Sequence, residues 1–161
     1  PISDEGIEIF REWYFPAVRE AVALDGAEPT AAWIAKRLGL SEAEVDEALD
    51  TLLDRGFLKQ EGTRLTRSAP SVRTDRKKTY PLILAAYHMK VMERAFPALR
   101  LPRDKRHFEG LTFAVPKSKL PVIKEMIQRF FREVDLMVEA EGKREEIYHR
   151  SEEHTSELQS H

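Results

Sequence analysis

The residues best suited to chemistry in this 161-residue chain are basic ones, gathered in a single stretch. Residues 55–78 contain eight Lys or Arg and only two acids, Glu61 and Asp75. Lys and Arg side chains neutralise and hydrogen-bond phosphates, and such contacts supply much of the affinity of a protein for DNA. We expect a solvated basic loop here, and if this part of the chain contacts nucleic acid, the contact should fall within this stretch. The candidate contact residues are Arg64, Arg67, Arg73, Arg76, Lys77 and Lys78.

The segment that overlaps the start of this stretch, residues 42–55, has the opposite charge. Its only basic residue is Arg55, and its acids are Glu42, Glu44, Asp46, Glu47, Asp50 and Asp54. DNA carries about one negative charge per 1.7 Å of its axis, so a helix with this composition would be repelled by the groove. We expect residues 42–55 to pack, to dimerise or to offer an acidic face to a partner, rather than to read DNA.

The histidines do not form a pattern that predicts catalysis or metal binding. His88, His107 and His149 lack the spacing of metal ligands, and Tyr87-His88 has no neighbouring carboxylate motif. Seven glycines leave little material for a phosphate-binding loop, and neither G-x-S-x-G nor H-E-x-x-H occurs. The sequence predicts no catalytic residue, no metal site and no cofactor, and we expect that the protein is not an enzyme.

The composition is that of a folded, neutral protein. Residues 1–149 carry 25 basic and 25 acidic side chains, because the last twelve residues hold one of the 26 Lys+Arg and three of the 28 Asp+Glu. There is no Cys, which fits a reducing compartment, and no apolar run approaches the roughly 20 residues of a membrane span. We expect a cytoplasmic protein with no membrane contact.

The last twelve residues, 150–161, read RSEEHTSELQSH and have no apolar periodicity. The string matches the translation of a common sequencing adapter, so we expect a non-native tail that does not pack. The first residue is Pro1, not Met. On this reading, the chain is a fragment that lacks native sequence at both ends.

The first half of the chain predicts a leading helix followed by a helix–turn–helix. Apolar residues recur at helical steps over residues 4–24, with an interruption expected near Tyr14 because of Pro16. Thr30 is a good N-cap for a helix over residues 30–38, and Gly39 provides the turn.

A second helix and a hairpin complete this half. Ser41 and Glu44 form a capping box at the start of a helix over residues 42–55. Two short strands then surround Glu61-Gly62-Thr63, at 57–60 and 64–67. Helix, turn, helix and hairpin in this order predict a winged helix-turn-helix, which together with the leading helix occupies residues 1–67.

The second half predicts a different architecture. Residues 68–79 have no core periodicity and are expected to be a linker. A helix over residues 80–100 is followed by an apolar strand at 110–115. The stripe of this helix is Leu84, Tyr87, Val91, Ala95 and Leu99.

A long helix from Ser118 to Gly142 follows, and a strand beginning near Glu145 should pair with the strand at 110–115. The stripe of the long helix is Leu120, Ile123, Ile127, Phe130, Val134 and Val138. We therefore expect an α+β, mainly helical chain, in which a small helix–strand–helix–(strand) unit occupies residues 80–149.

The ordered set of segments resembles a family. Its elements are WYFP at 13–16, the helix-turn-helix segment 33–59, Tyr87-His88, the segment 108–133 and EEIYH at 145–149. This set is similar to a bacterial domain of unknown function that follows a small N-terminal helix-turn-helix domain in regulator-like proteins. The resemblance implies a DNA-binding domain ahead of Pro1, a closing strand after Tyr148 and a role in transcription. That family usually has His where this chain has Phe15.

These observations together predict the effector or dimerisation module of a bacterial transcription regulator whose main DNA-binding domain lies outside this chain. The expected partners are a second copy, giving a homodimer, and DNA, bound weakly or not at all by this part. One alternative is a protein-interaction scaffold without DNA contact. The other is a small-molecule sensor with its pocket between the winged helix and the second unit.

Overall fold

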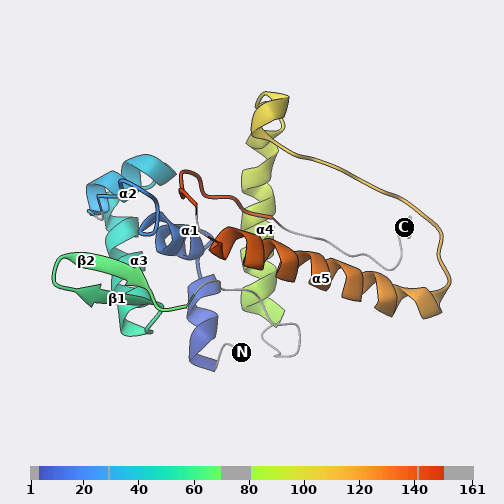
Figure 1. Ribbon diagram of the computed structural model, residues 1–161, viewed down its shortest axis with the longest axis horizontal. Helices are drawn as coiled ribbons and strands as arrows, with labels where there is room; N and C mark the ends of the chain where they lie inside the picture. The colour runs from blue at the N-terminus through green and yellow to red at the C-terminus, as the bar shows by residue number, and fades with distance from the viewer. Residues whose placement is uncertain (1–3, 29, 70–80, 141, 151–161) are drawn as a thin grey trace.

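The chain folds as a mainly helical α+β protein, seen in a computed structural model that describes residues 4–28, 30–69, 81–140 and 142–150 (Figure 1). These residues contain five α-helices and one two-stranded antiparallel sheet. The helices are α1 Tyr14–Ala21, α2 Ala31–Leu38, α3 Glu42–Asp54, α4 Pro81–Ala98 and α5 Leu120–Glu139, and the strands are β1 Leu58–Glu61 and β2 Arg64–Arg67. Three short 3-10 helices are η1 Asp4–Phe10, η2 Arg103–Lys105 and η3 Lys117–Lys119.

The single helix expected over residues 4–24 is divided in two. The 3-10 helix η1 ends at Phe10 and α1 begins at Tyr14, so the break falls just before the predicted position. Pro16 is the third residue of α1, where a backbone amide has no partner within the helix. The proline therefore fits the start of α1 without loss of a helical hydrogen bond.

Local capping signals position α2 and α3 as the sequence predicts. The Thr30 hydroxyl accepts a hydrogen bond from the Trp33 amide at 3.2 Å. At α3, Ser41 Oγ accepts from the Glu44 amide at 3.3 Å, and the Glu44 carboxylate accepts from the Ser41 amide at 2.8 Å. Gly39, between the two helices, has a φ of +67°, a left-handed value that favours glycine. The capping box and the tight turn are both confirmed.

The hairpin follows α3 directly. Leu58 pairs with Arg67 and Glu61 with Arg64, around a turn in which Gly62 has a φ of +63°. The strands lie within one residue of the predicted ranges. Leu58 is 2% exposed and faces the core, whereas the other side chains of β1 point to solvent.

One hydrophobic core joins these elements, which we call the N-terminal unit (the described residues between 4 and 69). Fully buried side chains come from every helix of the unit and from β1; the largest apolar ones are Ile9, Phe15, Val18, Ile34, Val45, Leu52 and Leu58. Helix α3 packs on α1, α2, η1 and β1. Among the described residues, Tyr87 is the one buried core residue from outside this unit.

Helix α4 contacts the N-terminal unit through the predicted stripe. Tyr87 is 5% exposed and packs edge-on against Phe10, with ring centroids 5.1 Å apart. Leu84 and Val91 lie half-buried against the same core. Leu99, placed at the end of this stripe, instead lies past the end of the helix and is about half exposed.

The strand expected at 110–115 does not form, which corrects the prediction of a helix–strand–helix–(strand) unit. These residues belong to a chain segment without assigned secondary structure, and Leu111 is 81% exposed. The intended partner segment instead runs along the N-terminal unit. Its Arg144 carbonyl accepts from the Asp25 amide at 2.8 Å, and the Arg144 amide donates to the Asp25 carboxylate at 2.6 Å. A continuous apolar run does not specify a strand when its neighbour is bound elsewhere.

Helix α5 extends away from the N-terminal unit in Figure 1. Leu120, Ile123, Ile127 and Val134 are half-buried as predicted, but no residue of this 20-residue helix is fully buried. Phe130 and Val138, also placed in the stripe, are exposed, and Phe131 is half-buried in place of Phe130. Most of the predicted linker and the tail from residue 151 lie outside the described residues.

Candidate functional site

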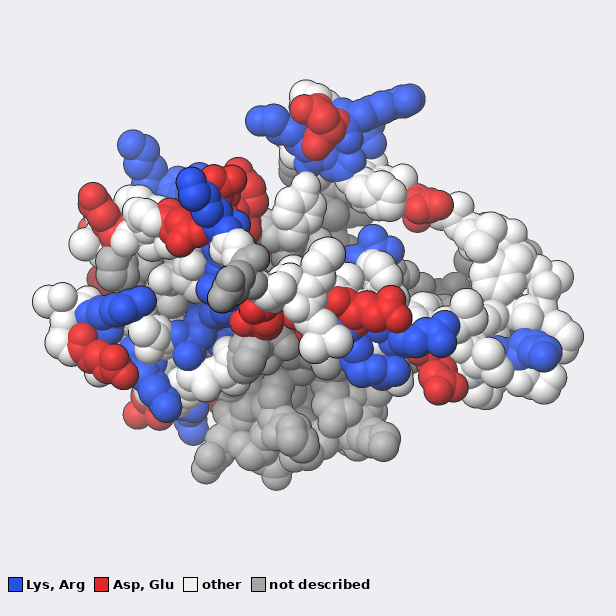
Figure 2. Space-filling view, viewed as in Figure 1, with Lys and Arg blue, Asp and Glu red and all other residues white. Residues whose placement is uncertain are grey.

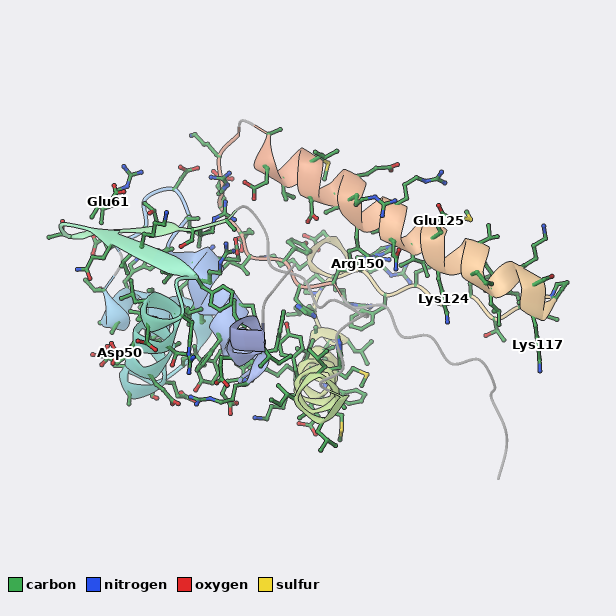
Figure 3. The ribbon with its side chains drawn as sticks, turned by 90° about the horizontal axis from the view of Figure 1, so that it is seen from below. Asp50, Glu61, Lys117, Lys124, Glu125 and Arg150 are labelled. Atoms are coloured by element: carbon green, nitrogen blue, oxygen red, sulfur yellow. The ribbon has the colours of Figure 1, made fainter. Side chains whose placement is uncertain are left out.

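Helix α3 presents a row of carboxylates to solvent. Glu42, Asp46, Asp50 and Asp54 follow each other at steps of four, so they lie on one side of the helix, and all four are exposed. We call this row the acidic ridge; Figure 3 shows Asp50 on the N-terminal unit, far from α5. Glu47, on the same helix, is held by Arg11 at 2.5 Å. The ridge gives α3 a solvent-facing row of negative charge.

The structure describes two of the predicted basic contact residues, Arg64 and Arg67, and places them in different surroundings. Arg64 begins β2 and is exposed. The Arg67 side chain is only 12% exposed: one of its terminal nitrogens lies 2.6 Å from a Glu20 carboxylate oxygen and the other 3.3 Å from Glu139. Arg67 is therefore held in an ion-pair network, and its DNA contact stays a prediction. The other four residues, Arg73, Arg76, Lys77 and Lys78, lie outside the described residues.

The ion pairs of Arg67 connect three elements. Glu20 lies on α1, Arg67 on β2 and Glu139 at the end of α5, where Glu139 also contacts Arg144 at 3.5 Å. The neighbouring Arg19 is 1% exposed and contacts Glu20 and the Ala69 carbonyl. Burial lowers the pKa of the Arg19 guanidinium, an effect that the Glu20 carboxylate opposes. The cluster fixes the last turn of α5 to the N-terminal unit.

The Tyr87-His88 pair lies in an aromatic cluster. The Tyr87 ring is 5.4 Å from the His88 ring and 6.2 Å from that of His149, measured between centroids. Burial raises the pKa of Tyr87 to about 12. Desolvation, and secondarily the charge of His88, lower the pKa of His149. Both shifts favour the neutral forms of Tyr87 and His149, and the arrangement favours packing over proton transfer.

Helix α4 carries a second apolar face, which the sequence reading missed. Its residues recur at steps of three and four, and all are exposed: Leu82, Ala85, Met89, Met92 and Phe96, with Leu99 continuing the spacing one residue past the end of the helix. We call this row the α4 seam. The spacing is that of the a and d positions of a heptad, which two paired helices bury between them. The spacing of the seam is visible in the sequence, but only the other apolar stripe of the same helix, which includes Leu84, Tyr87 and Val91, was assigned to the core.

Helix α5 is likewise apolar beyond its half-buried side. Val122, Met126, Phe130 and Met137 share an adjoining side of the helix and are between 41% and 69% exposed. Figure 2 shows uncharged, white surface at the far right of the molecule, with blue and red side chains beside it toward the centre, while blue and red alternate over the N-terminal unit at the left. In Figure 3, Lys124 and Glu125 project from α5, and Lys117 projects from the preceding 3-10 helix η3. These exposed sides of α4 and α5 are the strongest candidate interaction surface.

A basic tip follows α4, at the top of Figure 2. Arg100, Arg103, Lys105 and Arg106 accompany a single acid, Asp104. The first three are exposed and Arg106 is half-buried. Residues 100–106 thus form a second basic region besides the stretch 55–78.

Neither a metal site nor a membrane-spanning helix is found among the described residues. No group of three or more His, Asp or Glu side chains there is arranged to hold a metal ion. No described helix has the length and apolar character to cross a membrane.

Comparison with known proteins identifies the family. A family model described as "Domain of unknown function (DUF4423)" matches residues 1–151, nearly the whole chain, so the chain belongs to that family. No curated protein and no solved structure matches it.

Proposed function

We propose that this member of the DUF4423 family is the dimerisation or effector module of a transcription regulator, and that another part of the protein makes the main DNA contact. The observation that carries the proposal is the exposed apolar surface of α4 and α5. Proteins rarely leave large apolar surfaces uncovered unless those surfaces bind another protein. A module with this surface joins chains or relays a signal between them.

We infer that the N-terminal unit is a winged helix-turn-helix that does not read DNA. The helix order, the turn at Gly39 and the β1–β2 hairpin support this fold. In such a fold α3 would be the recognition helix. Four exposed carboxylates on one side of α3 oppose that use, because the helix would bring like charge to the phosphates. Any contact with DNA falls to Arg64, Arg67 and the basic residues at 73–78.

Two measurements on the whole chain test this function. Sedimentation over a wide range of protein concentrations should show reversible self-association. Gel-shift assays with duplex DNA should show no sequence-selective binding, and any shift should disappear steeply as salt rises. Replacing Arg73, Arg76, Lys77 and Lys78 together by Ala should remove that residual shift.

The outcomes separate the competing functions. Self-association without any shift would favour the scaffold without DNA contact. A monomer that binds one DNA sequence tightly, and loses that binding when Asp46 and Asp50 are both changed to Ala, would overturn the proposal. The matched control is Glu61→Ala, which removes one exposed acid from the hairpin instead of the ridge.

A further inference from the structure

We infer that the α4 seam is the surface on which two copies of this chain pair, with the two α4 helices antiparallel about a twofold axis. This inference rests on the proposed function and names the element and the partner. Its starting point is the uninterrupted three–four alternation from Leu82 to Leu99. The alternation covers all of α4, no member is charged, and Leu82, Met89 and Phe96 are 84%, 58% and 66% exposed.

The opposite face of α4 is already occupied, which leaves the seam for a partner. Tyr87 packs on Phe10, Lys90 pairs with Glu12 at 2.6 Å, and the Arg94 guanidinium stacks over Trp13 at 3.7 Å. These contacts hold α4 to the N-terminal unit along its packed side. Two apolar faces on one helix indicate that it lies between two neighbours in the assembled state.

The sizes of the seam residues favour a second copy of the same helix, running antiparallel. A twofold axis midway between Met89 and Met92 places Met89 of each copy opposite Met92 of the other copy. The same axis places the small Ala85 opposite the large Phe96 at both ends of the contact. A parallel pair would instead set Ala85 against Ala85 and Phe96 against Phe96. Facing positions that alternate small and large side chains pack without voids or crowding.

Charges beside the seam are compatible with this arrangement. The positions that flank it are Ala86, His88, Glu93 and Ala95. In the antiparallel pair, Glu93 lies across from Ala86 of the second copy, and His88 lies across from Ala95. Neither titratable group then meets a like charge, so the contact carries no electrostatic penalty between the two helices.

The length of the seam indicates how strong the contact is. Helix α4 has 18 residues. At 1.5 Å per residue and a strip about 10 Å wide, the seam covers roughly 300 Å² of each copy. A standard specific interface buries about 800 Å² per partner. The seam alone therefore predicts a dimer that dissociates on dilution and not a permanent one.

Sedimentation of seam variants of the whole chain tests whether the seam is the contact. Met89→Lys places a charge beside the axis and should raise the dimer dissociation constant at least about tenfold, equivalent to about 1.4 kcal/mol. The matched control is Leu111→Lys, which charges a still more exposed apolar side chain outside α4 and should leave the constant unchanged. Circular dichroism and melting temperature should match the unaltered chain for both variants, because neither side chain is buried.

Cysteine cross-linking tests the orientation against a clean background, because the chain has no Cys. A disulfide needs Cα atoms within about 7 Å. Ala85→Cys alone and Phe96→Cys alone should give no covalent dimer, since eleven residues separate these positions, about 16 Å along the helix. The variant with both changes should give a covalent dimer on oxidation.

Each outcome decides a different point. A chain that is monomeric at every concentration overturns both this inference and the proposed function. A dimer that Met89→Lys leaves intact overturns the seam but leaves the proposed function standing. A covalent dimer from Ala85→Cys alone overturns the antiparallel arrangement.

Discussion

The N-terminal unit and helix α5 are both amphipathic, yet only the first forms a closed core. Short, tight connections such as the turn at Gly39 bring α2, α3 and the hairpin together, so their apolar faces can only meet one another. Helix α5 is reached from α4 through residues 99–119, which contain only two 3-10 turns, and it has no fully buried residue. The apolar face of an amphipathic helix is stable only when a partner covers it. A short connection to the next element brings that partner from the same chain, whereas the long segment before α5 leaves its apolar face uncovered.

The sharpest test of this contrast compares truncations in the two regions. Leu52→Ala empties a position that is fully buried on α3 and should lower the free energy of unfolding by about 2–5 kcal/mol. Leu136→Ala on α5, where the side chain is 76% exposed, should change it by less than about 0.5 kcal/mol. Urea denaturation of each variant measures this free energy. Equal losses would mean that α5 is packed as closely as α3.

The next largest loss of stability is expected at the ion pairs of Arg67, which connect α5 to the N-terminal unit. Arg67→Ala leaves Glu20 and Glu139 without this guanidinium and should cost about 1.5–3 kcal/mol, the range for hydrogen bonds to charged groups. Arg64→Ala, on the same strand but exposed, is the matched control and should be nearly neutral. Urea denaturation reads both variants. A neutral Arg67→Ala would show that α5 is not anchored through β2.

A smaller loss should follow from removal of the capping box. Ser41→Ala deletes the hydroxyl that accepts from the Glu44 amide and should destabilise the N-terminal unit by about 1 kcal/mol. The reciprocal variant Glu44→Ala removes the acceptor of the Ser41 amide. Thermal unfolding of the two single variants and the double variant measures their coupling. Additive losses would contradict a reciprocal pair.

The smallest predicted effect is a dependence on pH through His149. Its pKa in the fold is below the ordinary value of 6.5, so the fold binds fewer protons there than the unfolded chain does. The resulting stability is present above pH 6.5 and is lost as the pH falls through the lower, folded-state pKa. Melting temperatures at pH 7.5 and pH 5 should therefore differ less for His149→Gln than for the unaltered chain. An unchanged difference would place the pH dependence in other groups.

What the sequence predicted well is what short-range chemistry determines. Thr30, Ser41 with Glu44, and Gly62 each act within three or four residues, and the elements that they begin or turn were located to within a residue or two. The strand at 110–115 and the environment of α5 were wrong or incomplete because they depend on distant partners. Nothing near Glu145 in the sequence indicates that this segment binds Asp25 and Arg37 instead of a strand.

In the candidate site, too, the sequence predicted the features that depend on neighbouring residues and missed those that depend on distant ones. The negative charge of α3 could be predicted because all the acids of the ridge lie within one short segment of the sequence. The burial of Arg67 was not, since its partners Glu20 and Glu139 lie 47 and 72 residues away. The α4 seam was legible as a pattern, but its exposure could be seen only after the other face of the helix had been placed on Phe10 and Trp13.

The position of Trp13 beneath Arg94 has a spectroscopic consequence. The chain has two tryptophans, Trp13 and Trp33, and both lie in the N-terminal unit. Intrinsic tryptophan fluorescence therefore reports on that unit and on the attachment of α4, while far-UV ellipticity also counts the 20 residues of α5. If α5 melts separately, the ellipticity transition will begin before the emission maximum shifts. Coincident transitions would show that the charges around Arg67 make the two regions unfold as one.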